Sequence, residues 1–202
     1  MSQDDFEMPK KKKRVNGKSK GGSFERRIAV ELSQWWSDCH RDDLFWRTAS
    51  SGGRATQRKK KGKQTGDSGD IASTDPFSTA MTKVFSIELK CGYNSNTLDV
   101  LLRTPDKSGL TSFFNQAVES QSQSNARSWL VIHKIDRKPI VLYMPTDTFN
   151  ELCLYRKENK LPLVDIPYLN VVIPDYRVTC MLFDSFMLMF NRHDIERLLE
   201  YF

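Results

Sequence analysis

The sequence predicts an α/β fold in which one mixed sheet is flanked by helices. Two observations lead to this prediction. Segments with helical and strand-like periodicity alternate along the chain, and residues 83–90 alternate polar and apolar side chains with a period of two. The length of 202 residues, at ~150 residues per domain, leaves room for one compact core with extensions.

Apolar periodicity and turn residues place the individual elements. The first helix begins at Ser23, whose side chain can cap it. In chain order we expect a helix from 23 to about 37–40, strands at 43–48, 70–72 and 83–90, a helix over 110–126, strands at 129–133 and 139–144, a helix over 146–155, strands at 169–173 and 178–182, and a final helix from about 194.

The N-terminal end of the chain differs in composition from the rest. Residues 1–22 are polar and rich in Lys, Gly and Ser, which predicts a disordered basic tail. Within it, residues 9–15 (PKKKKRV) resemble a nuclear import signal, and a DNA-binding tail is the alternative. Residues 23–202 are expected to form a single domain, with a core at 23–144 and an extension at 145–202 that serves dimerisation or completes the sheet.

The charge is distributed unevenly along the chain. Residues 1–63 carry 17 basic and 8 acidic side chains, whereas residues 64–202 carry 14 and 17. This imbalance favours a polyanionic partner, nucleic acid first. No stretch reaches the ~18 apolar residues of a membrane span, and the four cysteines form no CxxC pair, so we expect a soluble intracellular protein with free thiols and no membrane partner.

The triplet Glu88-Leu89-Lys90 brings a carboxylate and an ammonium group to one face of a strand, because side chains two residues apart point the same way. The alternative is an ordinary surface ion pair. The same pattern recurs at 136–138 and 158–160, in a turn and at a helix end, but only Glu88 and Lys90 lie within an apolar strand.

A second carboxylate precedes this strand. Asp70 follows Gly69 at the start of a short strand, and if that strand lies beside residues 83–90, Asp70, Glu88 and Lys90 converge. Two neighbouring carboxylates need a cation, and oxygen ligands favour Mg²⁺ or Mn²⁺ over zinc. The alternative is that Asp70 is only a turn residue.

Asp70 and Glu88-Leu-Lys90, eighteen residues later, resemble the signature of the PD-(D/E)XK nuclease superfamily, with Gly69 where Pro often stands. The motifs at 22–27 (GSFERR), 47–53 (RTASSGG), 69–71 and 87–90 follow the order seen in archaeal-type Holliday junction resolvases, over residues 21–133. The resemblance implies a restriction-endonuclease-like core that hydrolyses DNA phosphodiester bonds with one or two Mg²⁺ (or Mn²⁺) per active site.

It also implies roles for single residues. Asp70 and Glu88 would bind the metal, and Lys90 would orient the attacking water or stabilise charge on the phosphorane. Glu25 shares a helical face with apolar residues, so it is expected to point inward and help hold the metal; the alternative is a favourable charge at a helix N-terminus. Ser51 would hydrogen-bond a phosphate, unless it is only a turn residue.

DNA contacts are expected around this centre. Nothing in the sequence resembles a base-reading helix, which favours recognition of DNA structure over sequence. Cleavage of a four-way junction at symmetric positions would require a homodimer. The predicted DNA-binding residues are Arg47, Ser51, Arg54, Arg58, Lys59, Lys60, Lys61, Lys63 and Gln116.

Two other functions stay open from the sequence. The first keeps the fold and makes the protein a repair, restriction-like or end-processing nuclease. The second is a non-catalytic nucleic-acid-binding protein in which the acidic cluster is structural.

Overall fold

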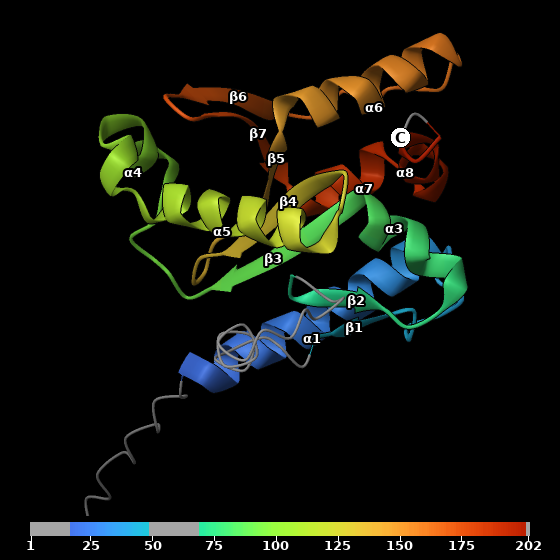
Figure 1. The fold of residues 1–202 in the computed structure, drawn as a ribbon, viewed down its shortest axis with the longest axis horizontal. Coiled ribbons are helices and arrows are strands. Elements are labelled where there is room, and N and C mark those ends of the chain that lie inside the picture. Colours follow the sequence, from blue (N-terminus) through green and yellow to red (C-terminus); the bar gives the residue numbers. More distant parts are fainter. Residues whose placement is uncertain (1–16, 49–68, 201–202) are drawn as a thin grey trace, which may run out of the picture.

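The computed structural model describes residues 17–48 and 69–200 (Figure 1). The basic segment 49–68 and residues 1–16, which include the candidate import signal, lie outside the described residues. The strands are β1 (Phe45–Arg47), β2 (Ile71–Ser73), β3 (Phe85–Cys91), β4 (Ser128–Lys134), β5 (Ile140–Pro145), β6 (Tyr168–Ile173) and β7 (Tyr176–Leu182).

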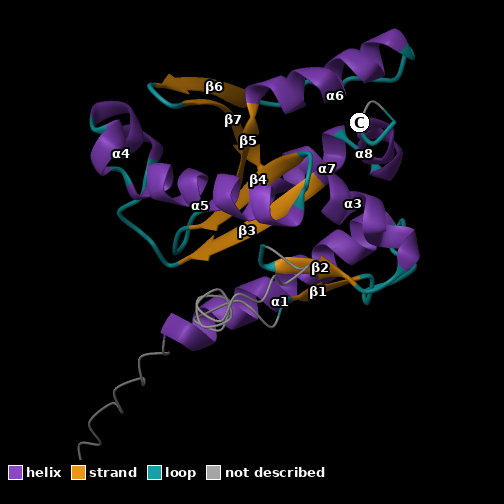
Figure 2. Ribbon diagram, in the orientation of Figure 1, coloured by secondary structure: helices purple, strands orange, loops and turns teal. Residues whose placement is uncertain are grey.

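Helices surround these strands (Figure 2). They are α1 (Gly17–Trp36), α3 (Thr79–Val84), α4 (Leu98–Arg103), α5 (Gly109–Ser124), α6 (Thr146–Glu158), α7 (Phe183–Met189) and α8 (Arg192–Leu198), with short 3₁₀ turns at Pro76–Ser78 and Pro105–Lys107. None of the helices in the described ranges is long and apolar enough to cross a membrane.

The main sheet has five strands in the order β3-β4-β5-β7-β6. β3 and β4 run parallel, and the other neighbours run antiparallel. This confirms the α/β fold with a mixed, helix-flanked sheet, as in a restriction-endonuclease-like core. β1 and β2 form a separate antiparallel pair whose end approaches the outer edge of β3, where the Asp70 backbone N–H donates to the Ile87 carbonyl at 2.7 Å.

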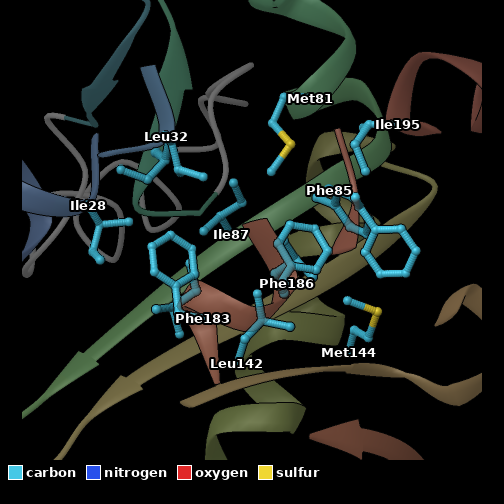
Figure 3. Close-up of a cluster of buried hydrophobic side chains, with 14 of the residues drawn as sticks. Ile28, Leu32, Met81, Phe85, Ile87, Leu142, Met144, Phe183, Phe186 and Ile195 are labelled. Atoms are coloured by element: carbon cyan, nitrogen blue, oxygen red, sulfur yellow. The ribbon is translucent and has the colours of Figure 1, made fainter. Parts of the chain in front are cut away.

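Apolar side chains cover both faces of this sheet, because helices pack on each face and bury it. One cluster joins the sheet to α1, α3, α6, α7 and α8. Figure 3 shows side chains of α1, β3, β5 and α7 meeting in it, among them Ile28, Ile87, Leu142 and Phe183. A second cluster joins the opposite face to α4 and α5. Between these layers, β3 has little contact with water.

The C-terminal third is built into the same sheet. β7 lies between β5 and β6, and Phe183 and Phe186 of α7 are fully buried in one cluster with Ile28 of α1. Residues 145–200 therefore complete the sheet and its core. Their contribution to dimerisation stays a prediction.

The first helix begins earlier than predicted. Residues 17–22, expected in the tail, are helical, and Ser23 lies inside α1 and does not cap it. Gly22 packs against β1, since a Cβ atom there would lie 3.0 Å from the Arg47 guanidinium. Helix propensity disfavours glycine, and the contact with β1 is one that the local sequence pattern does not reveal.

Three short helices were missed. α3, α4 and α7 have six or seven residues each, which is too short for a 3.6-residue period to be recognised. Because α3 continues through Val84, the predicted strand 83–90 begins only at Phe85.

Candidate active site

β3 fixes the positions of Glu88 and Lys90. Its alternation directs Ile87 and Leu89 into the cluster that includes α1, and it directs Glu88 and Lys90 to the opposite face, beneath α5. Glu88 is 2% exposed and Lys90 8% exposed. Lys90 Nζ donates to Glu88 Oε2 at 3.1 Å, so the predicted pair shares one face, buried and not on the surface.

Asp70 is held against the outer edge of β3 by its own backbone and side chain. Its N–H donates to the Ile87 carbonyl at 2.7 Å, and its Oδ2 accepts from the Leu89 N–H at 2.8 Å. Gly69 makes this approach possible: its φ is +86°, and a Cβ atom would lie 2.9 Å from the Ile87 oxygen. Proline, with φ fixed near −65°, could not adopt this conformation, which explains the departure from the usual motif.

Helix α5 adds two polar side chains one turn apart, which places them on the same helical face. Gln116 bridges the charged pair, because its Nε2 donates to Glu88 Oε2 at 2.9 Å and its Oε1 accepts from Lys90 Nζ at 2.6 Å. Ser120 donates to Glu88 Oε1 at 2.7 Å. Sequence reasoning missed Ser120, although its spacing of four from Gln116 could have indicated it.

Lys90 lies over the ring of Phe113, with Nζ 5.4 Å from the ring centroid, a distance at which the π face attracts a cation. His133 is its neighbour on β4 and packs against the same ring. Burial lowers the pKa of His133 to about 4, so this histidine is neutral near pH 7. The positive charge beside Glu88 is therefore that of Lys90.

The carboxyl group of Asp70 lies in an unfavourable environment for a negative charge. Its pKa is raised to about 7, first by burial, then by the charge of Glu88 and, to a smaller extent, of Glu25. The Leu89 N–H and Lys90 act in the opposite direction. A bound cation would favour the ionised form of both carboxylates.

Glu25 of α1 points toward the body of the protein, as its helical phase predicts. Its Oε2 lies 3.0 Å from Arg47 Nε, and the Glu25 side chain is 14% exposed. Arg47, predicted to bind DNA, is thus the ion-pair partner of a candidate metal ligand. The described residues contain no cluster of three or more His, Cys, Asp or Glu side chains that could hold a metal.

Asp70 and Glu88 nevertheless suit a hard divalent cation. Mg²⁺ keeps several waters and is commonly bound by one or two carboxylates together with substrate phosphate oxygens. The two carboxylates supply oxygen donors only, and both lie within electrostatic range of each other. The residues present therefore fit Mg²⁺ or Mn²⁺.

The other predicted contacts lie in the segment 49–68, outside the described residues: Ser51, Arg54, Arg58, Lys59, Lys60, Lys61 and Lys63. The residues that flank this segment are described. Thr48 donates its N–H to the Asp70 carbonyl at 2.9 Å and its hydroxyl to the Gly69 carbonyl at 2.8 Å. The described residues on either side of the basic segment, Thr48 and Gly69, are therefore both next to Asp70.

Comparison with known proteins places this site in a family. The model of the family described as "Phage putative PDDEXK endonuclease" matches residues 16–197, a range that includes Glu25, Asp70, Glu88 and Lys90. No curated protein and no solved structure matches the chain significantly. The match covers most of the chain, which therefore belongs to this family of PD-(D/E)XK nucleases.

Proposed function

We propose that this nuclease is a Mg²⁺-dependent DNA endonuclease whose active site consists of Asp70, Glu88 and Lys90. The observation that carries the proposal is the convergence of two carboxylates and one lysine at β3, where Glu88 and Lys90 are buried and Asp70 is half-buried. Asp70 and Glu88 would hold the cation. When bound, it would polarise the scissile phosphate and lower the pKa of a bound water.

Lys90 is suited to stabilise developing negative charge. Its ammonium group is held by Glu88 Oε2 and Gln116 Oε1, so it is already oriented before DNA binds. A fixed cation in a site with little water stabilises a transition state more strongly than a mobile one in solvent. We assign Lys90 to the attacking water or to the phosphorane oxygens.

Glu25 and Arg47 are proposed to act at the border of the site. Glu25 influences the charge state of Asp70, and it would assist the metal through a water molecule. Arg47 is 30% exposed in its side chain and can contact a DNA phosphate while it keeps Glu25 in place. Ser51 and the basic residues of 54–63 would contact phosphates close to Asp70.

For the substrate we propose branched DNA, with the four-way junction as the first candidate. The order of motifs resembles that of archaeal-type resolvases, and a basic segment whose flanking residues Thr48 and Gly69 lie beside Asp70 supports phosphate contacts without base reading. Symmetric cleavage would require a homodimer.

Incubation of the purified protein with duplex, single-stranded and four-way-junction DNA, in Mg²⁺ or in EDTA, tests this function. We expect Mg²⁺-dependent cutting with a preference for the junction, and paired nicks at symmetric positions. Equal cutting of linear duplexes or of ends would favour a restriction-like or end-processing nuclease. DNA binding without cleavage in either Mg²⁺ or Mn²⁺ would refute the proposal that the protein is an enzyme.

A further inference from the structure

We propose that Ser120 is a positioning residue that fixes the plane of the Glu88 carboxylate, so that Glu88 Oε1 can bind the metal ion. The inference rests on the proposed function. Ser120 Oγ donates to Glu88 Oε1 at 2.7 Å. The other oxygen, Oε2, accepts from Gln116 Nε2 at 2.9 Å and from Lys90 Nζ at 3.1 Å.

The number of acceptor sites decides which oxygen can bind a cation. A carboxylate oxygen offers about two acceptor sites. Both sites of Glu88 Oε2 are used by Gln116 and Lys90, whereas Oε1 uses one for Ser120 and keeps one. Glu88 can therefore bind a metal through Oε1 without breaking a hydrogen bond of the site.

The two oxygens of Asp70 also differ in their hydrogen bonds. Its Oδ2 accepts the Leu89 N–H, so Oδ1 is the oxygen of Asp70 with more acceptor capacity left. One oxygen of each carboxylate thus keeps acceptor capacity for a cation. On the Glu88 side, this arrangement depends on donors from α5, of which Ser120 is the one bonded to the metal-facing oxygen.

Removal of the Ser120 hydroxyl should affect the metal more than the fold. Rotation about the last torsion of a Glu side chain has a broad, shallow profile, so hydrogen bonds set the plane of the carboxylate. Without Ser120, only the Oε2 side would be fixed. Loss of such a partner of a metal ligand typically weakens metal binding about 10- to 100-fold.

Helix α5 offers a matched control. Ser124 lies one turn beyond Ser120, and its hydroxyl donates to the main-chain oxygens of Ser120 at 2.9 Å and Gln121 at 3.1 Å. Ser124→Ala therefore removes a serine hydroxyl from the same helix but leaves the Ser120 side chain and Glu88 unchanged.

The experiment measures Mn²⁺ binding to the full chain by calorimetry without DNA, and junction cleavage over a range of Mg²⁺ concentrations. For Ser120→Ala we expect Mn²⁺ binding about 10- to 100-fold weaker, a matching rise in the Mg²⁺ needed for half-maximal cutting, and a rate at saturating Mg²⁺ within about threefold of wild type. Ser120→Cys keeps the volume but is a weak donor, so it should behave like Ser120→Ala. Ser120→Thr and Ser124→Ala should bind Mn²⁺ like wild type.

The outcomes separate this inference from the function on which it rests. If Asp70→Asn loses Mn²⁺ binding but Ser120→Ala and Ser120→Cys keep wild-type affinity, the role of Ser120 is wrong and the nuclease assignment stands. A lower saturating rate at unchanged Mn²⁺ affinity would also overturn it. If wild type neither binds Mn²⁺ nor cuts DNA in Mg²⁺, the proposed function itself fails. Ser120→Cys provides the same test should Ser120→Ala not fold.

Discussion

At the scale of single residues, Asp70, Glu88 and Lys90 have different roles, so their substitution should affect metal binding and cleavage differently. Asp70 and Glu88 supply negative oxygens, whereas Lys90 supplies a fixed positive charge between Glu88 and Gln116. Substitutions that keep shape and remove charge can separate these duties.

Asp70→Asn and Glu88→Gln should each reduce cleavage by more than the ~100-fold that follows loss of an outer partner of a metal ligand. DNA binding should be equal or tighter, because less negative charge faces the phosphates. Cleavage rates and gel-shift affinities measured on the same junction check both parts. Near-normal Mg²⁺-dependent cutting by either variant would show that the metal is bound elsewhere.

Lys90→Ala should be nearly inactive and still bind Mn²⁺, because it removes no carboxylate. Lys138 and Lys160 are matched controls from the two other acid-x-Lys triplets, and both are exposed. Lys138→Ala and Lys160→Ala should cut at the wild-type rate in the same assay. Equal losses at all three positions would indicate a general effect of positive charge.

The raised pKa of Asp70 predicts a pH dependence of stability in EDTA. With a pKa of about 7 in the folded state, Asp70 keeps its proton between pH ~4 and pH ~7, where the unfolded chain has released it. The free energy of unfolding therefore falls as pH rises through this window. Asp70→Asn lacks this titration, so it should be more stable than wild type at pH 8, by roughly 1–4 kcal/mol, and should gain nothing near pH 4.

Urea unfolding of both proteins in EDTA at pH 4, 6 and 8 measures this difference. Parallel stability curves for wild type and Asp70→Asn would show that Asp70 titrates normally. Addition of Mg²⁺ should reduce the advantage of the variant at pH 8, because a bound cation stabilises the ionised wild-type site.

At the scale of elements, the approach of β2 to β3 depends on one glycine. Gly69 has φ +86° and Gly92 has φ +84°, but a Cβ atom at Gly69 would lie 2.9 Å from the Ile87 oxygen, whereas one at Gly92 would meet nothing within 4 Å. Both positions therefore have a left-handed backbone, but only Gly69 lacks room for a side chain.

Gly69→Ala should therefore destabilise the protein more than Gly92→Ala. The positive φ should cost each variant about 1–2 kcal/mol, and the contact with β3 should cost Gly69→Ala more. Because Asp70 would be displaced from Leu89, Gly69→Ala should also lose Mn²⁺ affinity. Denaturant unfolding and calorimetry check this; equal behaviour of the two variants would mean that the edge of β3 tolerates a side chain.

At the scale of the whole molecule, the path of the chain brings the two residues that flank the basic segment 49–68 to the site. Thr48 and Gly69 meet at Asp70. The lysines and arginines of this segment account for much of the excess of 17 basic over 8 acidic residues in positions 1–63.

Neutralisation of Arg58, Lys59, Lys60 and Lys61 should make the salt dependence of DNA binding shallower. Each duplex phosphate neutralised contributes ~0.9 to the slope of log affinity against log salt, so the slope should decrease by up to about 3–4. Saturating DNA should restore most of the cutting rate, since these residues are expected to position DNA. An unchanged slope would show that the DNA-binding surface lies elsewhere. Inactivity at saturating DNA would indicate a catalytic role for the segment.

The sequence by itself determined the elements with a long or regular period. The apolar face of α1, the alternation of β3 and the helix α5 are local patterns, and a 3.6- or two-residue period is visible without knowledge of the fold. The shared face of Glu88 and Lys90 follows from the same geometry. The motif spacing further indicated the superfamily that the family match confirms.

Only the tertiary structure decided which distant residues meet. Gly22 of α1 packs against Arg47 of β1, and the C-terminal strands belong to the main sheet because β7 pairs with β5. The contact of Ser120 with Glu88 joins residues 32 positions apart. A local pattern carries no information on such contacts, because they depend on how whole elements pack. The motif gives the carboxylates, and the packing of α5 on β3 decides which oxygen of Glu88 remains for a metal.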